Sequence, residues 1–259
     1  HPSWAGIQRT EFSRQFLFVD NVDKVDRIVF WTRIPMVHTG VFSGFLVFSW
    51  SNNLYGFKAG TFALFLYAFS PTMLAHTRLV TMDIGAACFI FLAVYCFYLY
   101  CRNPSSKNLM LSGVTFGLAQ LAKYTAIYLY FLYPIFFLLF WFLRKKEFML
   151  DYKISKNIKK LLFSILFIFL VGNFIVFCGY FCELKPLLLN DIDVKEKIAY
   201  FQTFIAKLFG ENSEFLSEKF ISFALNQPIP FSTYIMGFLG ASNQTFAEHR
   251  FSVMLFGDY

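Results

Sequence analysis

Three ionisable residues, His76, Arg78 and Asp83, stand close together in an otherwise apolar part of the sequence. They belong to the polar segment SPTMLAHTRLVTMD, Ser70 to Asp83, which has a long apolar stretch on each side. Ionisable groups close to a bilayer core are costly, so they usually face a wet cavity or a partner and carry function. We therefore expect a functional site at one face of a membrane, where Asp83 begins a helix.

The composition is that of a membrane protein. Hydrophobic residues make up 57% of the chain and charged residues 15%, whereas soluble domains contain about 25% charged residues. The net charge is +7, and much of it lies in one run, Arg144 to Lys160 (RKKEFMLDYKISKNIKK). A basic loop between two apolar spans marks the cytoplasmic side of a membrane. The basic balance therefore favours a membrane topology signal over a nucleic-acid partner.

The five cysteines lie in or at the ends of apolar segments: Cys88, Cys96, Cys101, Cys178 and Cys182. They form no CxxC pair, and no Cys/His spacing typical of metal ligands is present. We expect them to be small apolar residues of helices.

The sequence predicts an all-α fold, a polytopic transmembrane helical bundle with amphipathic external helices. About six spans can be drawn, of which the fourth is shorter than the roughly 20 residues that a straight crossing needs. They are Trp31–Trp50, Gly60–Met73, Ile84–Cys101, Leu109–Leu121, Thr125–Leu143 and Leu161–Phe181. Three regions follow: residues 1–30 as the end of a first external loop, 31–183 as the bundle, and 184–259 as a truncated external amphipathic region.

The basic loop also sets the orientation. If residues 144–160 are cytoplasmic, then residues 1–30, the polar segment around His76 and the tail from Glu183 onward are external. Five ionisable residues then share the external face, as a polar site open to the periplasm or lumen requires: Arg33, His76, Arg78, Asp83 and Lys123. The alternative is that Arg33 and Lys123 only snorkel to the interface, as cations at helix ends often do.

Several motifs, in their order along the chain, together resemble one family of membrane enzymes. They are TRIPMV at the start of a span, LYGFKAG, LFLYAFSPTMLAHTRLVTMDIGAACFIFLAVY and GLAQLAKYTAI. In these the chain is similar to the polytopic C-type (GT-C) glycosyltransferases, in the branch of the protein O-mannosyltransferases and aminoarabinose transferases. The segment HRFSVMLFGDY, near residue 259, also resembles a periplasmic motif of that family.

The resemblance implies a membrane glycosyltransferase that moves a sugar from a polyprenyl-phosphate carrier to a protein, lipid or glycan acceptor on the external face. Its implied partners are the lipid-linked sugar donor and membrane lipids, not nucleic acid. Its implied location is the bacterial inner membrane, as a multi-pass protein. In the family the principal catalytic acid lies in the first external loop, so we expect it upstream of His1 and expect this chain alone to be an inactive fragment.

The implied chemistry gives the remaining residues roles. A phosphate leaving group needs cations that neutralise its developing charge, and Arg78 and Lys123 suit this, with Arg33 and His76 as further phosphate contacts. Asp83 would accept the acceptor's proton, or hold a metal or the acceptor in line. An equally open alternative for Asp83 is a helix cap, for which Asp is well suited.

Other assignments stay open at the level of sequence. His249 and Asp258 are candidates for contacts in an external loop, and His76 and His249 could ligate a metal, although a lone His is more often structural. No cofactor is specified, and a divalent metal ion is one alternative. A different function is a polytopic transporter or flippase for a lipid-linked or anionic substrate. Transporters usually show internal repeats, and none is found here.

Overall fold

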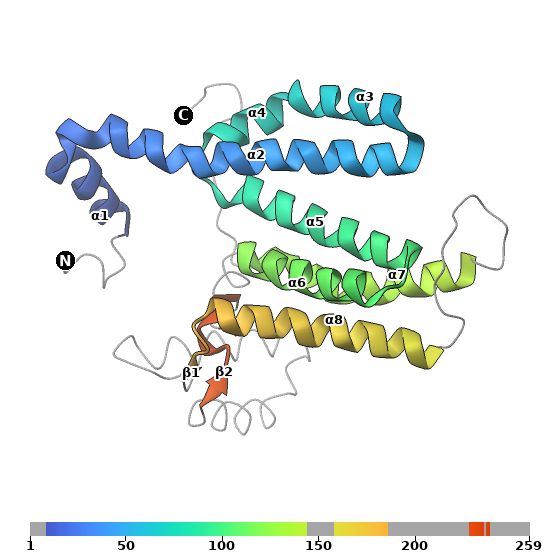
Figure 1. The fold of residues 1–259 in the computed structure, drawn as a ribbon. Helices are drawn as coiled ribbons and strands as arrows, with labels where there is room; N and C mark the ends of the chain where they lie inside the picture. The colour runs from blue at the N-terminus through green and yellow to red at the C-terminus, as the bar shows by residue number, and fades with distance from the viewer. Residues whose placement is uncertain (1–8, 144–157, 186–227, 236, 239–259) are drawn as a thin grey trace, which may run out of the picture. The chain divides into compact units, whose positions relative to one another are not determined.

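The computed structural model describes residues 9–143, 158–185, 228–235 and 237–238. Over these residues the chain is almost entirely helical (Figure 1), which confirms the predicted all-α fold class. It forms two compact units, His1–Tyr98 and Leu99–Tyr259. Helix α5 (Met82–Arg102) contributes residues to both units.

The first unit begins with α1 (Arg9–Gln15), a π-helical turn (Phe16–Asp20) and a 3₁₀ turn (Val22–Lys24). The long helix α2 (Val25–Tyr55) follows. It begins upstream of the predicted start at Trp31, so the boundary that the sequence placed at residue 30 falls inside a helix.

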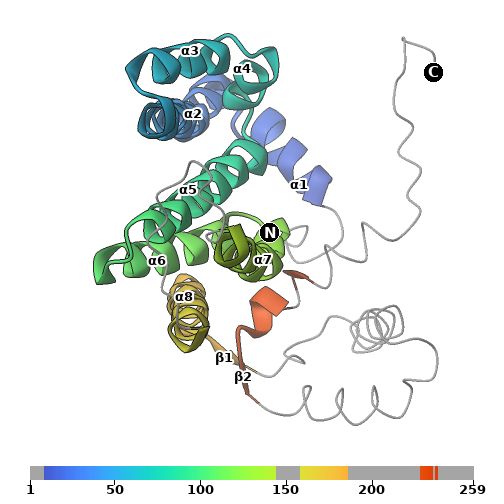
Figure 2. The same ribbon diagram turned by 90° about the vertical axis from the view of Figure 1, so that its right-hand side faces the viewer.

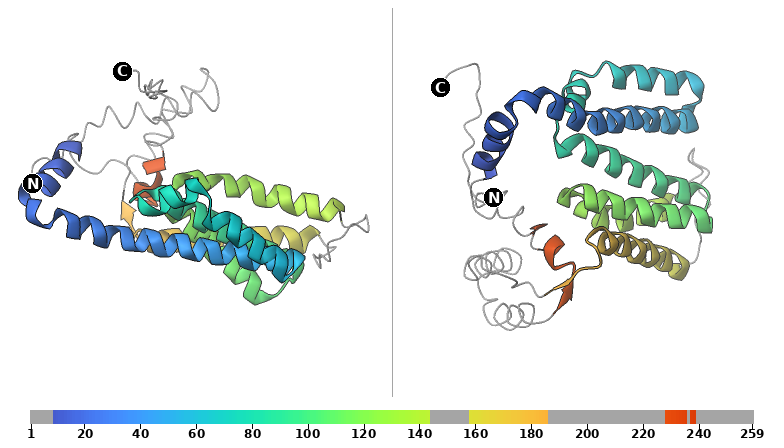
Figure 3. Two further views of the ribbon diagram at one scale, coloured as in Figure 1. Left: turned by 90° about the horizontal axis from the view of Figure 1, so that it is seen from above. Right: turned by 60° about the vertical axis from the view of Figure 1, so that its left-hand side comes forward.

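Helix α2 and helix α3 (Phe57–Ala68) lie side by side as an antiparallel hairpin (Figure 3). Gly56 joins them with a φ of 86°, a left-handed conformation that glycine adopts without steric cost. Trp50, near this end of α2, lies against α5, with its ring centroid 5.0 to 5.6 Å from the rings of Phe91, Tyr95 and Tyr98. These aromatic pairs are at attractive distances and hold α5 against α2.

The polar segment folds as a short helix and a non-helical connection. Helix α4 (Pro71–Arg78) has Pro71 in its first turn, where the missing N–H costs nothing because it would have no helical partner. Pro71 therefore separates two helices, as the sequence predicted. The predicted second span, Gly60–Met73, is wrong at its end because α3 stops at Ala68 and the last residues belong to α4.

The second unit contains α6 (Ser106–Ala122), a 3₁₀ turn (Tyr124–Tyr128), α7 (Leu129–Leu143) and α8 (Ile158–Gly179). A short antiparallel pair, β1 (Leu184–Lys185) and β2 (Ile229–Pro230), follows α8, with Leu184 opposite Pro230.

Aromatic side chains fill the interior of the second unit. Phe116 of α6 is fully buried, and its ring centroid lies 4.8 to 5.3 Å from the rings of Tyr130, Tyr133 and Phe169. The Tyr130 hydroxyl donates a hydrogen bond to Oδ1 of Asn173 at 2.9 Å. Helices α6, α7 and α8 thus share one core.

Three helical stretches of the described residues are long and apolar enough to cross a membrane: Val22–Tyr55, Met82–Arg102 and Lys159–Gly179. The stretches Phe57–Ala68 and Tyr124–Leu139 are apolar but shorter. Large apolar side chains cover the outside of these helices, including those of Phe45, Phe163 and Phe174. The fold is therefore that of a polytopic membrane protein, with three helices long enough to span a membrane and further shorter apolar helices in the described residues.

Candidate functional site

In the first unit, close packing at one glycine positions the helix that carries His76 and Arg78. A Cβ added at Gly40 of α2 would lie 2.5 Å from Cγ2 of Thr77 of α4, so only glycine allows this approach. The Tyr67 hydroxyl of α3 donates a hydrogen bond to the Gly40 carbonyl oxygen at 2.8 Å. Helices α2, α3 and α4, which lie together in Figure 2, are tied at this point.

The structure brings His76 and Asp83 together. Nδ1 of His76 lies 3.9 Å from Oδ2 of Asp83, and the two side chains are 42% and 51% exposed. Among the described residues, Nδ1 of His76 and Oγ1 of Thr81 are buried atoms with no hydrogen-bond partner. Because buried polar atoms normally have partners, their arrangement around the start of α5 fits a site that binds a polar group.

Asp83 lies inside α5 rather than at its cap. The helix begins at Met82, so Thr81 holds the capping position and Asp83 lies in the first turn. A carboxylate in the first turn interacts favourably with the positive end of the helix dipole. The start of α5 is therefore where the sequence predicted it, but Asp83 is not the N-cap.

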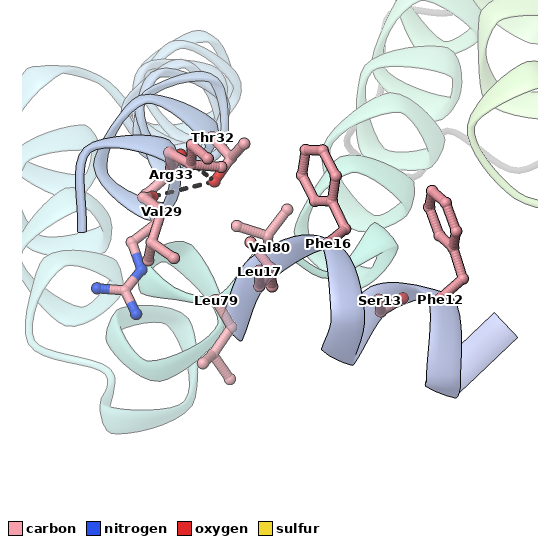
Figure 4. A pocket seen from close by; sticks show the side chains of 10 residues that line it. Phe12, Ser13, Phe16, Leu17, Val29, Thr32, Arg33, Leu79 and Val80 are labelled. Atoms are coloured by element: carbon pink, nitrogen blue, oxygen red, sulfur yellow. Dashed lines mark hydrogen bonds between the residues drawn. The ribbon is translucent and has the colours of Figure 1, made fainter. Parts of the chain in front are cut away.

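An apolar pocket of about 400 Å³ lies beside the connection between α4 and α5 (Figure 4). Arg33 supplies the one charge among the lining residues. The apolar lining consists of Phe12, Phe16, Leu17, Ile28, Val29, Leu79 and Val80. Figure 4 shows the Arg33 guanidinium at one side of this group of side chains. Leu79 and Val80 directly follow Arg78, the exposed last residue of α4. The pocket thus combines an apolar interior with a cation.

Lys123 belongs to the second unit, at the break between α6 and the following 3₁₀ turn, where its backbone is extended (φ −161°, ψ 141°). Gln120, only 1% exposed, spans this break. Its Nε2 donates to the carbonyl oxygen of Ala126 at 2.8 Å, and its Oε1 accepts from the Tyr234 hydroxyl at 3.1 Å. One buried amide therefore fixes the backbone that presents Lys123. Its predicted convergence with Asp83 and Arg78 stays a prediction.

Sequence reasoning missed a cluster of three tyrosines, Tyr124, Tyr180 and Tyr234. The hydroxyl oxygens of Tyr124 and Tyr180 are 3.5 Å apart, and the Tyr234 ring centroid lies 5.4 and 5.9 Å from the other two rings. Burial raises the pKa of Tyr180, and its hydrogen bond with Tyr124 raises it further. Burial likewise raises the pKa of Tyr234, so both phenols are neutral at physiological pH. No local pattern signals a cluster whose members are so far apart in sequence.

Some predicted residues lie outside the described part of the chain. These are His249 and Asp258, together with the amphipathic segments expected beyond residue 185. Within the described part, no group of three or more His, Cys, Asp or Glu side chains is placed to hold a metal ion.

The apolar helices and the polar cluster at the start of α5 define an integral membrane protein with a candidate polar site at helix ends. A family model described as dolichyl-phosphate-mannose-protein mannosyltransferase matches residues 28–175, more than half of the chain. The chain belongs to this family, and it is a membrane glycosyltransferase that uses a lipid-linked sugar donor. The match confirms the resemblance to C-type glycosyltransferases. Searches of curated proteins and of solved structures found no match.

Proposed function

We propose that this protein transfers a sugar from a polyprenyl-phosphate carrier to an acceptor at the external face of the membrane, and that Asp83 and Arg78 belong to its active site. The observation that carries the proposal is the polar cluster at the start of α5. There the Asp83 carboxylate lies 3.9 Å from Nδ1 of His76, and this Nδ1 and Oγ1 of Thr81 are buried atoms that have no hydrogen-bond partner in the described residues.

In this proposal Asp83 is the base for the acceptor. As the acceptor oxygen forms its bond to the sugar, its proton passes to the Asp83 carboxylate, and the bond between the sugar and the carrier phosphate breaks. About half of the Asp83 side chain is exposed, so the carboxylate is accessible from outside the protein. His76, when protonated, stabilises the ionised carboxylate that this role requires.

The carrier leaves as a polyprenyl phosphate, so its departure needs positive charge and an apolar surface. Arg78 can form two parallel hydrogen bonds to a phosphate, and it directly precedes the residues that line the pocket. Arg33 adds a second cation at that pocket, whose apolar lining suits a prenyl chain. Lys123 and His76 remain proposed phosphate contacts.

The test replaces Asp83 by Asn in the intact enzyme and measures sugar transfer from a polyprenyl-phosphate donor. A positioned acid–base group contributes typically about 10²- to 10⁴-fold to the rate, so we expect Asp83→Asn to lose at least about 10²-fold. Asp26→Asn is the matched control because Asp26 is also an exposed first-turn Asp, in α2, and it should keep wild-type transfer. Wild-type transfer by Asp83→Asn, at equal expression, would refute the assignment.

A further inference from the structure

The chain turns back on itself directly after α8. The N–H of Phe181 donates to the carbonyl oxygen of Cys178 at 3.0 Å, and the N–H of Cys182 donates to that of Phe177 at 2.9 Å. This pair of bonds is the Schellman arrangement, which ends many helices. It folds Cys182 back over the last turn of α8, where Cys178 lies.

The residues that make this turn are unusual for their conformation. Phe181 and Cys182 have φ values of 55° and 54°, in the left-handed region that residues with a Cβ rarely adopt. Packing does not hold Phe181 in place, because its side chain is 96% exposed. Because two consecutive residues adopt this costly conformation, we expect a further interaction to hold the turn in place.

The side chains of Cys178 and Cys182 can supply that restraint. Both are exposed free cysteines, and their thiols are in hydrogen-bond contact with each other. The two hydrogen bonds of the turn bring the backbone of Cys182 over the last turn of α8, on which Cys178 lies, and a disulfide requires such a close approach of its two residues. Cys88, Cys96 and Cys101, by contrast, are buried in the bundle.

We propose that Cys178 and Cys182 are a redox modification site that closes to an intramolecular disulfide in the turn after α8. The oxidant is a disulfide, carried by a small molecule or by a dithiol oxidoreductase. One cysteine thiolate attacks the oxidant disulfide, which forms a mixed disulfide and releases one oxidant thiol. The other cysteine thiolate then attacks the chain's sulfur in that mixed disulfide and releases the second oxidant thiol. The two protons of the cysteines end on the two oxidant thiols.

A disulfide between Cys178 and Cys182 would lie next to the tyrosine cluster. Tyr180 lies between the two cysteines, and its hydroxyl and ring contact Tyr124 and Tyr234. Strand β1 begins two residues after Cys182, at Leu184, and pairs with β2. A disulfide between the two cysteines therefore restrains the turn after α8. This turn carries Tyr180, which contacts Tyr234, and leads into β1, which pairs with β2. The inference does not depend on the proposed transfer chemistry.

The test uses the intact protein, purified in detergent, fully reduced, freed of reductant and then incubated with oxidised glutathione. After alkylation and digestion, mass spectrometry should show that the wild-type peptide that contains both cysteines has a mass two hydrogens below that of its dithiol form. The peptide should carry no glutathione adduct. Cys178→Ser and Cys182→Ser cannot close the bond, so the remaining cysteine in each should be free or glutathionylated. Wild-type protein with both thiols free, with glutathione adducts, or linked between chains would overturn the proposal.

Discussion

The contact between α6 and α8 makes a sharp prediction about stability. A Cβ at Gly117 of α6 would lie 2.6 Å from the carbonyl oxygen of Gly172 and 2.7 Å from Cβ of Ile175 in α8. A backbone oxygen and a branched Cβ cannot move aside as the end of a flexible side chain can. We therefore expect Gly117→Ala to force the two helices apart and to destabilise the protein.

The magnitude follows from two opposing terms. Adding a methyl group to a well-packed core costs about 1–3 kcal/mol, and the backbone obstacle at Gly117 favours the upper part of this range. Replacing a helical Gly by Ala returns about 1 kcal/mol through helix propensity. The net loss is about 1–2 kcal/mol, which corresponds to a Tm lower by about 2–8 °C for a protein of this size.

The assay is thermal unfolding of the intact protein in detergent, followed by tryptophan fluorescence. Gly85→Ala is the matched control: Gly85 is also a helical glycine, in α5, but a Cβ there would meet nothing within 4 Å. This control should keep or raise the Tm. If Gly117→Ala were as stable as Gly85→Ala, the close approach of α6 and α8 would be refuted.

Three further predictions concern the phosphate contact of Arg78, the hydrogen bond between Tyr234 and Gln120, and the membrane topology. Arg78→Lys keeps the charge but loses the bidentate geometry, so transfer should fall by about 10- to 100-fold, the equivalent of one charge-assisted hydrogen bond; unchanged kinetics would exclude a phosphate contact. Tyr234→Phe leaves the buried Gln120 oxygen without its hydrogen bond and should lower the free energy of unfolding by about 1–3 kcal/mol. An unchanged free energy of unfolding would show that the bond between Tyr234 and Gln120 does not form in solution. In a chain whose native cysteines are replaced by Ser, a cysteine introduced at Asn243 should be labelled by an impermeant reagent outside intact cells, and one introduced at Ser155 should not, since the basic loop is expected inside. Labelling at position 155 would reverse the topology.

The helix order of the fold could be predicted because apolar runs and their breakers are local signals. Pro71 ended one helix and opened the next, and α5 (Met82–Arg102) matches the predicted span Ile84–Cys101 closely, since charged residues mark both its ends. Span lengths were less predictable. Hydropathy does not distinguish a full crossing from a shorter apolar helix such as α3, which ends where a turn precedes Pro71.

The candidate site could be predicted only in part. His76 and Asp83 were singled out by charge in an apolar context, but their proximity depends on how α4 meets α5. Gln120 and Tyr234 gave no signal, because they are 114 residues apart in sequence and interact only in the folded chain. Tertiary packing, rather than any local pattern, decides such contacts.

The fate of the bond between sugar and carrier tests the central claim most directly. The intact enzyme is reconstituted in vesicles with polyprenyl-phosphate mannose, radiolabelled in the sugar, and with membrane proteins as acceptors. Our account predicts that the label moves to the acceptors, that free polyprenyl phosphate appears in equal amount, and that Asp83→Asn suppresses both. Label that remains on the carrier and only crosses from one leaflet to the other would contradict it, since that is the behaviour of a flippase.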